Sequence, residues 1–577
     1  MAKKKKTPFA RPTWSLRIAA TGVFLAQIVV LPGAASPFRL PKEALTLAAL
    51  AIAIAIAVAA AARRRRIALP AGRLAAVLAA YPVLLAVSVI WSADPLRSLQ
   101  AAAVTAIWLS GLFWLSTVDN ADRQRLHLAA AVGVSFSIAV LILQIVGVQT
   151  FNFGAQTTGR MRLTGLTGNP ADLAMAAVLV LPLLLADSQR MSRSRWWRGL
   201  VVLLASSVVM TRTLTGVAAL AAVAAVWLWQ QRSKRVWIAV GATALLLAVG
   251  AATTGLGSRI VDQADRLRRG EWYALLSARA DGWTAATEMI RSHPGTGVGG
   301  ANFTVAYYPS RIDWLQRNGG TGGRGEIASH FERAHNDPIQ LQAELGIFGT
   351  AWAIALAVTI FGTRRRSSPL LALAAGAWTP FALLHYPSHL AVGLIPTSLV
   401  LAHLVRAERE PVEREWRRWR RPIAIAAAIL AVVIAWWQLQ RVAVNLWMGS
   451  NDVRLQVLEQ APPEVRARHA RGIENQIVAR IDRLPLQAPA LWRTVGRARI
   501  LQNDLNGAAQ AFAAAHELWP HEDSEFYLGL TLAATGKRTE ALQRLGRVCR
   551  TNPALIQLIN DPGLRRAVED IIESYSR

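Results

Sequence analysis

The sequence predicts an all-α polytopic membrane protein with about 12–13 transmembrane helices. Hydrophobic residues make up 53% of the 577 residues, which is too apolar for a large soluble protein. Apolar segments long enough to cross a bilayer recur along the chain, and Lys and Arg gather in short clusters between them. These patterns predict a helical membrane bundle with one long loop and a polar C-terminal tail.

The apolar segments fit a bilayer because a helix rises about 1.5 Å per residue and the hydrocarbon core is about 30 Å thick. The predicted segments are 14–32, 42–62, 73–92, 98–117, 127–148, 170–187, 199–211, 213–229, 236–254, 338–362, 369–386, 390–405 and 422–440. The turn after 199–211 carries Arg212. An ionisable residue in that setting is costly and is therefore a candidate for function.

The basic clusters predict the orientation, because all of them fall on alternate connections. They are Lys3–Lys6, Arg63–Arg66, Arg190–Arg198, Arg232–Arg235, Arg364–Arg366 and Arg406–Arg421. The positive-inside rule assigns that side to the cytoplasm, so the 255–337 loop and the tail are expected on the outer face. A net charge of +29 in a soluble protein would suggest nucleic-acid binding. Here the basic clusters are confined to the connections between apolar segments, which argues against nucleic-acid binding.

Two further features restrict the class of protein. The single cysteine, Cys549, excludes an internal disulfide and a cysteine-rich metal site. Lys3–Lys6 precede an apolar stretch without a convincing cleavage site, so a retained first helix is expected rather than a signal peptide.

The 255–337 loop contains two glycine runs. Gly295–Gly300 resembles a phosphate-binding loop but lacks the Lys-Ser/Thr pair of a P-loop, so we interpret it as a flexible connector. Gly319–Gly323 is expected to be mobile and to act as a lid.

The sequence predicts two domains, a transmembrane domain over 1–441 and a helical domain over 442–577. The tail contains an internal repeat of about 33 residues, with small residues at helix crossings and a proline closing each unit. The matched pairs are Gly496/Gly529, Asn503/Gly536, Ala508/Ala541, Phe512/Leu545 and Pro520/Pro553. This pattern is typical of tetratricopeptide repeats, which bind partners through a concave face. A plain helical hairpin domain is the alternative.

The stretch 333–340 closes the polar loop and opens an apolar segment. Asp337 and Pro338 predict a helix N-cap and first helical position, with Gln340 three residues after the cap. His335 then lies just outside a helix N-terminus at the membrane edge. An imidazole beside the positive end of a helix suits a catalytic site for an anionic substrate. An interfacial histidine without a catalytic role is the alternative.

Arginines on the same outer face are candidates for binding that anion. Arg212 lies at a hairpin tip, and Arg279 lies in an amphipathic stretch with Trp283 four residues on. Arg162 precedes Asn169, which with the next proline starts a second membrane helix on this face. Guanidinium groups and helix N-termini together suit a pyrophosphate.

The same residues also have structural explanations. Arg279 could extend its charge to the interface, and Arg160 and Arg162 could bind lipid headgroups. No DxD pair lies in an outward loop and no HExxH motif is present, while His330 and His335 are poorly spaced for shared helical metal ligation. We therefore expect metal-independent transfer without a cofactor, in which His335 removes a proton from a hydroxyl.

Several of these stretches resemble the O-antigen ligase and polymerase superfamily, over about residues 75–400. The stretches are Trp91–Pro95, Gly165–Ala174, Arg279–Trp283 followed by Gly297–Gly299, and Ala334–Pro338 followed by Glu344–Gly346. The sequence departs from the family at the hairpin tip, where Arg212 stands between two threonines instead of after a serine. Arg212 is taken to fill the family's role there.

The resemblance implies a GT-C-like transferase in a bacterial inner membrane, with the large loop and the C-terminal domain in the periplasm. The donor would be an undecaprenyl-pyrophosphate-linked glycan, and transfer would invert the anomeric carbon. His335 would activate or orient the acceptor hydroxyl. The residues that would bind pyrophosphate are Arg279, Arg212 and Arg162, and those that would support the site are Asn336, Asp337, Trp283, Asp94 and Asn169.

The resemblance leaves the acceptor open. A ligase transfers to lipid A-core, a polymerase extends another lipid-linked glycan, and a related branch glycosylates protein as an O-oligosaccharyltransferase. The repeats slightly favour an exopolysaccharide polymerase or protein glycosylation, since they could dock a polysaccharide-export partner or a protein acceptor. The alternatives of another class are a transporter or flippase for lipid-linked sugars, which would need charged or broken helices at mid-membrane depth, and a membrane scaffold.

Overall fold

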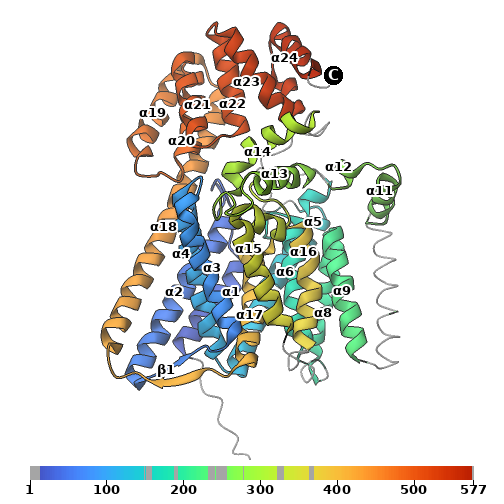
Figure 1. The fold of residues 1–577 in the computed structure, drawn as a ribbon, viewed down its shortest axis with the longest axis vertical. Coiled ribbons are helices and arrows are strands. Elements are labelled where there is room, and N and C mark those ends of the chain that lie inside the picture. The colour runs from blue at the N-terminus through green and yellow to red at the C-terminus, as the bar shows by residue number, and fades with distance from the viewer. Residues whose placement is uncertain are drawn as a thin grey trace, which may run out of the picture.

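The computed structural model describes residues 13–148, 150, 159–187, 191, 193–231, 241, 256–276, 279–320, 331–362 and 369–574. A bundle of apolar helices lies below a layer of loop helices, and a C-terminal helical domain lies above that layer (Figure 1). The predicted lid at 321–323 and His330 fall outside the described residues.

The membrane bundle is built from long apolar helices and short 3₁₀ turns. Its elements are α1 (Trp14–Ile28), α2 (Arg39–Arg64), α3 (Arg73–Val87), η1 (Ser88–Trp91), α4 (Pro95–Thr117), α5 (Asn120–Ile145), η2 (Gly159–Arg162), α6 (Pro170–Leu185), α8 (Arg195–Met210), α9 (Leu214–Gln231), α15 (Asp337–Phe361), α16 (Pro369–Leu384), η4 (Pro387–His389), α17 (Ala391–Glu408) and the first part of α18 (Arg420–Glu459).

Eight of the described helices are long and apolar enough to cross a membrane, and three shorter apolar helices, α1, α6 and α16, accompany them. Every predicted segment except 236–254 coincides with one helix of the bundle. The segment 236–254 lies outside the described residues apart from residue 241. The chain is therefore a multi-pass, helical membrane protein, and the total number of spans stays a prediction.

Helix α6 lies at the centre of the bundle. Every residue from Asp172 to Leu184 is buried, and α5, α8, α9, α16 and α17 pack around it. A helix that is apolar on all sides must be surrounded by other helices to be buried in this way. Its N-terminus is consequently held in one place, which fixes Asn169 and Asp172 for the site described below.

A short β-ribbon departs from the all-α prediction. β1 (Arg66–Leu69) pairs antiparallel with β2 (Val412–Glu415), at the end of the bundle opposite the loop helices (Figure 1). The two strands are the connections between α2 and α3 and between α17 and α18. Two extended linkers that run side by side satisfy their backbone groups by pairing, and four residues are too few to show a strand pattern in sequence.

The loop and the tail contain helices of their own. The loop helices are α11 (Leu256–Arg268), α12 (Trp272–Leu275), α13 (Arg279–Ser292) and α14 (Phe303–Asn318). The C-terminal domain contains the end of α18, then α19 (Pro463–Ile481), α20 (Ala488–Leu501), α21 (Leu505–Leu518), α22 (Glu522–Ala534), α23 (Arg538–Thr551), η5 (Pro553–Leu558) and α24 (Pro562–Ser574). Helix α18 is 40 residues long and crosses residue 441 without a break, so the proposed domain boundary lies inside a helix.

The hairpins α20–α21 and α22–α23 use equivalent positions in the same way. A Cβ built on Gly496 would lie 2.7 Å from the Phe512 ring, and one built on Gly529 would lie 2.7 Å from Leu545. Asn503 and Gly536 both adopt a left-handed φ in the turns. Small residues therefore let each helix pair approach closely. Whether these hairpins are tetratricopeptide repeats stays a prediction.

One apolar core joins the loop helices to the C-terminal domain. Met289 and Phe303, from α13 and α14, belong to the same buried cluster as Phe526, Leu545 and Cys549 from α22 and α23. Burial of this apolar surface stabilises the contact. The C-terminal domain is therefore packed against the loop, on the side of the loop away from the membrane bundle (Figure 1).

Candidate active site

Two membrane helices, α6 and α15, begin with an Asn cap followed closely by proline. Asn169 accepts a hydrogen bond from the Ala171 amide at 2.8 Å, and Asn336 accepts one from the Ile339 amide at 3.0 Å. The predicted cap Asp337 is therefore wrong by one residue. Asn336 has the extended backbone of a cap, while Asp337 is already helical.

His335 has an unusual backbone conformation. Its φ is +55°, a left-handed value that side chains other than glycine rarely adopt. Hydrogen bonds on both sides hold it there. The Ala334 amide donates to the Gln340 side chain at 3.0 Å, and the Asn336 side chain donates to the Leu383 carbonyl at 3.1 Å. Strain of this kind persists where the surroundings determine the geometry, which is common at functional sites.

Aromatic rings surround the His335 imidazole. The centroid of its ring is 4.7 Å from that of Tyr386 and 5.7 Å from those of Phe331 and His385. Its Nδ1 atom is buried and has no hydrogen-bond partner among the described residues. The imidazole is therefore held in place by ring contacts, while one of its nitrogens is left without a protein partner.

A chain of polar contacts lies behind these rings. His385 Nε2 is 2.8 Å from Asp172 Oδ1, and the other oxygen of Asp172 is 3.6 Å from Arg39 Nη2. Arg39 Nη2 also donates to the Tyr386 hydroxyl at 2.5 Å. The start of α2, the start of α6 and the segment before η4 are thus linked next to His335.

Arg279 reaches the same place from the loop. Gly282, on the next turn of α13, faces the Ala334 backbone, where a Cβ would make an ordinary contact 3.5 Å from the Ala334 carbonyl oxygen. Arg279 Nη1 donates to the Leu276 carbonyl at 3.2 Å, and its Nε is buried without a partner in the described part of the chain. We call His335, His385, Tyr386, Asp172, Arg39 and Arg279 the His335 cluster.

Burial and positive charge act together on His335. Burial, the neighbouring His385 and the guanidinium groups of Arg279 and Arg39 lower the pKa of the imidazole well below its usual range, and Asp172 offsets part of this. Burial also lowers the pKa of Arg279. His335 is therefore neutral at pH 7, as a proton acceptor must be.

The structure brings some predicted residues to this cluster and leaves others beside it. Arg212 adopts a left-handed φ at the hairpin tip, where its carbonyl accepts a hydrogen bond from Arg259. Its Nε is buried without a hydrogen-bond partner in the described part of the chain. Arg162 is half-buried in η2, ahead of α6. Trp283 lies one turn after Arg279 on α13. Its indole nitrogen is buried and has no partner in the described residues.

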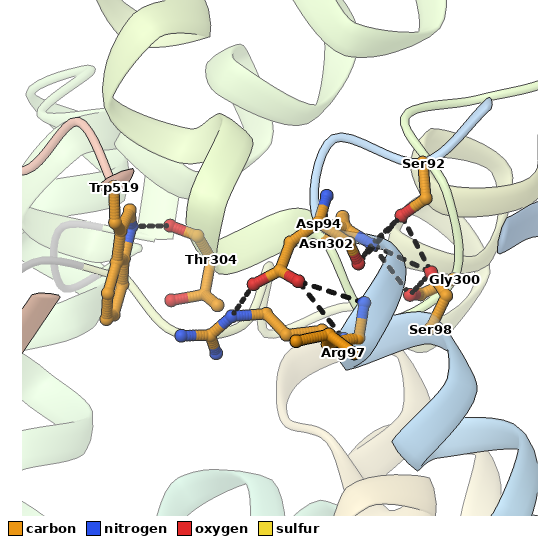
Figure 2. Close-up of polar contacts among 9 residues, drawn as sticks. Ser92, Asp94, Arg97, Ser98, Gly300, Asn302, Thr304 and Trp519 are labelled. Carbon is orange, nitrogen blue, oxygen red and sulfur yellow. Dashed lines mark hydrogen bonds and ion pairs between the residues drawn. The ribbon is translucent and has the colours of Figure 1, made fainter. Parts of the chain in front are cut away.

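Asp94 lies elsewhere, in a polar network that joins α4 to the loop. It caps α4, binds Arg97 Nε at 3.0 Å, and its amide donates to the Asn302 side chain at 2.7 Å. Asn302 in turn donates to Ser92 at 2.6 Å and to Ser98 at 2.9 Å (Figure 2). Asp94 therefore fixes the position of the loop on the bundle and does not belong to the His335 cluster.

The glycine run 295–300 is not a flexible connector, contrary to our prediction. It packs on a kink in α15 at Gly346, where φ is +57°. The amides of Val298 and Gly299 donate to the carbonyls of Ala343 and Glu344 at 3.0 and 2.9 Å. The loop thus supplies hydrogen bonds that the broken helix loses. Glycine is required because a Cβ at 297 would collide with the Glu344 carbonyl.

A cavity of about 1000 Å³ lies beside α15. Its wall is mainly apolar and runs from Asp337 at the start of the helix to Phe361 at its end. Polar residues lie where α15 begins, and we call five of them the cavity mouth: Arg97, Arg333, Asp337, Ser388 and His389. Asp337 accepts a hydrogen bond from the Ser388 amide at 3.2 Å, and its Oδ1 is 3.8 Å from His389 Nε2.

Arg39, Asp172 and His385 were not among the site residues predicted from the sequence. Some signals were present. Arg39 is the only Lys or Arg in the short predicted outward connection 33–41, and Asp172 is an acid in the first turn of a helix that is otherwise apolar. His385 and Tyr386 are adjacent polar rings in another outward turn. Their meeting with His335 depends on contacts far apart in the chain.

No group of three or more His, Cys, Asp or Glu residues that could hold a metal ion occurs in the described ranges. The prediction of metal-independent transfer remains to be tested by experiment.

The O-antigen ligase family model matches residues 199–354. This stretch begins within α8, contains α9, the loop helices, Arg212, Arg279 and His335, and ends within α15. No curated protein matches the chain. The match supports placing this membrane protein in the O-antigen ligase superfamily and indicates, at the level of the family, a glycosyltransferase-like enzyme with a role in glycan transfer.

Proposed function

We propose that the protein transfers a glycan from an undecaprenyl-pyrophosphate-linked donor to an acceptor hydroxyl, without a metal and with inversion at the anomeric carbon. One observation carries the proposal. A neutral imidazole with an unpartnered buried Nδ1, that of His335, lies beside the guanidinium groups of Arg279 and Arg39. A base next to fixed cations suits a reaction whose leaving group is an anion.

The proposal places this site on the periplasmic face of a bacterial inner membrane. The basic residues of 63–66 and 414–421 lie in and next to the β-ribbon, at the end of the bundle opposite the loop helices (Figure 1). Under the positive-inside rule that end faces the cytoplasm. The loop helices and the C-terminal domain then lie outside, where the donor must bring its own energy in its pyrophosphate bond.

The donor pyrophosphate would bind Arg279 and Arg39. The N-termini of α6 and α15 contribute partial positive charge at the same place. Arg212 and Arg162 are proposed to bind outer parts of the same group, because the hairpin tip lies next to the first turns of α6, with Gly216 against Ala174. Charge-assisted hydrogen bonds from several fixed donors would hold the pyrophosphate before and after the bond breaks.

In the proposed step the acceptor oxygen attacks the anomeric carbon and His335 takes the acceptor's proton. A new glycosidic C–O bond forms as the C–O bond to the pyrophosphate breaks, and the electron pair leaves with the pyrophosphate. Cations arranged in advance stabilise the charge that develops there. Asp172 would hold the His385 ring through their hydrogen bond, and His385 would in turn hold the Tyr386 ring next to His335. Neither Asp172 nor His385 needs to touch the substrate for this role.

Donor binding would also strengthen the base. In the empty site burial, His385 and the positive charges of Arg279 and Arg39 lower the pKa of His335. A bound pyrophosphate would offset the charge of the two arginines, so the pKa would rise towards that of an ordinary histidine. The imidazole would then be a stronger base when the donor is present than when it is absent.

The proposal is tested with purified protein, a labelled lipid-linked donor and a set of candidate acceptors. Transfer should persist after exhaustive chelation, and loss that added Mg²⁺ restores would contradict metal independence. A protein that moves intact donor across a vesicle membrane without consuming it would be a transporter instead. The acceptor that becomes labelled separates a ligase, a polymerase and a protein O-oligosaccharyltransferase.

A further inference from the structure

The cavity beside α15 is separate from the His335 cluster. None of the six residues of that cluster lines it, whereas the intervening segments contribute Arg333, Asp337 and His389 to its mouth. A second compartment with its own polar end therefore adjoins the proposed donor site.

The shape and lining of the cavity suit a lipid chain. It follows α15 from Asp337 to Phe361, which is at most about 36 Å at 1.5 Å per residue because the helix is kinked at Gly346, and this is close to the thickness of a bilayer's hydrocarbon core. Ile354 and Phe361 line it while remaining 59% and 63% exposed, so the cavity reaches the outer surface of the bundle. A chain in the membrane can enter from the side without crossing a polar barrier.

The mouth offers cations to an anionic headgroup. Arg97 and Arg333 both line it, and they repel each other electrostatically. Glu344 also lies there, but its carboxylate already accepts from the Ala301 and Phe303 amides and from Gln340. Two neighbouring guanidinium groups of this kind are stabilised by a bound anion such as a phosphate.

The C-terminal domain holds one of these cations in place. The Arg97 guanidinium lies over the Trp519 ring, 4.7 Å from its centroid, and Asp94 binds Arg97 Nε. The Trp519 indole is itself fixed by donation to the Thr304 carbonyl at 3.1 Å (Figure 2). A guanidinium stacked by its face keeps the N–H groups of its edge for another acceptor.

The mouth also offers a hydrogen-bond acceptor for a hydroxyl. Asp337 is 8% exposed, and its Oδ1 has no hydrogen-bond partner in the described part of the chain. Asp337 and His335 are two residues apart, on either side of the Asn336 cap. A hydroxyl held near Asp337 would lie between the two compartments.

We propose that this cavity binds the polyprenyl-type chain of a lipid-linked acceptor, with its phosphate at Arg97 and Arg333, so that the reaction extends a second lipid-linked glycan. The inference rests on the proposed function, since it names the acceptor of that transfer. It makes Trp519 a positioning residue, which acts through Arg97. It assigns the lipid-carried acceptor to a different compartment from the donor pyrophosphate.

The first test measures binding alone, with a photoreactive polyprenyl phosphate that carries no sugar. It should crosslink to peptides of α4, α15 and α17 in the full-length protein. Ala353→Trp, which fills the cavity, should abolish the crosslink, and Arg97→Gln or Arg333→Gln should weaken binding about tenfold or more. Val432→Trp is the control, because Val432 is 69% exposed on α18 and lies outside the cavity lining. A crosslink that Ala353→Trp leaves unchanged would overturn the proposal.

The second test compares a lipid-linked acceptor with a water-soluble sugar acceptor, using one labelled donor. Ala353→Trp should lower transfer to the lipid-linked acceptor and leave transfer to the soluble sugar unchanged. Equal loss with both acceptors would mean that the cavity holds the donor chain, and no loss with either would mean that it is not used. If the wild-type protein transfers to no acceptor, the proposed function fails, and the binding test still decides whether the cavity takes this lipid.

The role of Trp519 has its own measurement. Trp519→Ala should raise the KM for the lipid-linked acceptor several-fold with little change in kcat, and Trp519→Phe should restore much of it, because a phenyl ring still supports Arg97. An effect of Trp519→Ala that is equal for soluble and lipid-linked acceptors would contradict this positioning role.

Discussion

The His335 cluster and the cavity mouth lie on neighbouring segments but differ in how their charged groups are arranged. In the cluster, Asp172 is shared between His385 and Arg39, and an aromatic ring contacts every imidazole. In the mouth, Arg97 and Arg333 repel each other beside a long apolar wall, and Asp337 keeps an oxygen without a hydrogen bond. A compact site closed by aromatic rings suits chemistry at fixed positions. An open site with two neighbouring guanidinium groups, of which Arg97 is paired with Asp94 through its Nε, suits an anionic ligand.

Replacing His335 tests this contrast with the largest expected effect. His335→Ala removes the proposed base and should reduce transfer about 10²–10⁴-fold, the usual range for general acid–base catalysis. The measurement is transfer by protein of unchanged yield and thermal stability. His469→Ala, in an exposed position on α19, is the control. Normal transfer by His335→Ala would remove the catalytic role of the cluster.

Gly297→Ala should damage both compartments, because the glycine loop fixes the kink of α15, the helix that begins next to His335 and lines the cavity. The new Cβ would meet the Glu344 carbonyl, and φ is +68° at this position. We expect destabilisation of about 1–3 kcal/mol together with reduced transfer. Gly295→Ala is the matched control, since a Cβ there has no neighbour within 4 Å among the described residues. An equal midpoint of thermal unfolding in the two variants would argue against a stabilising contact between the glycine run and the kink of α15.

Arg279→Ala should act on the donor side alone. Losing charge-assisted hydrogen bonds worth about 1.5–3 kcal/mol would weaken donor binding about 10–150-fold, and Arg279→Lys should lose less. Binding is measured with labelled donor in the absence of acceptor. Arg291→Ala is the control on the same helix, because Arg291 pairs with Glu288 away from the cluster. Equal donor affinity in wild type and both variants at 279 would exclude a pyrophosphate contact.

Asp337→Asn should act on the acceptor side. The amide keeps the size of the side chain but replaces one acceptor oxygen with a donor, so the KM for acceptor should rise several-fold while donor affinity stays the same. A rise in the dissociation constant of the donor, without a change in acceptor KM, would place Asp337 with the His335 cluster instead.

The pH profile should show the smallest effect. The lowered pKa of His335 keeps the imidazole neutral in the free enzyme as pH falls through 6.5, so kcat/KM should stay flat between about pH 7.5 and 6. Arg279→Gln removes one positive neighbour and should raise this pKa in part, because burial, its largest cause, and His385 remain. A histidine with the ordinary pKa of about 6.5 would be only about a quarter neutral at pH 6, a loss of about fourfold. A wild-type profile that already falls about fourfold would show an unperturbed histidine.

The sequence alone determined the class of the protein. Long apolar segments separated by basic clusters can only bury their backbone groups as membrane helices, so each described segment appears where hydropathy places it. The helix starts at 169–170 and 336–338 follow from the side-chain chemistry of capping, which acts over three residues, although the cap of the second is Asn336 and not the predicted Asp337. The equivalence of Gly496 and Gly529 is likewise visible as a spacing in the chain.

Only the tertiary structure decided which residues meet. Arg39, Asp172 and His385 are far apart in sequence, and their contacts arise where the start of α2, the start of α6 and the segment between α16 and η4 meet. The glycine run 295–300 has the composition of a mobile linker, yet its amides are needed by a helix kink about 50 residues later. Spacing along the chain reports local hydrogen bonding and the period of a helix. Long-range burial and pairing of charge depend on the whole packed arrangement, which no local pattern contains.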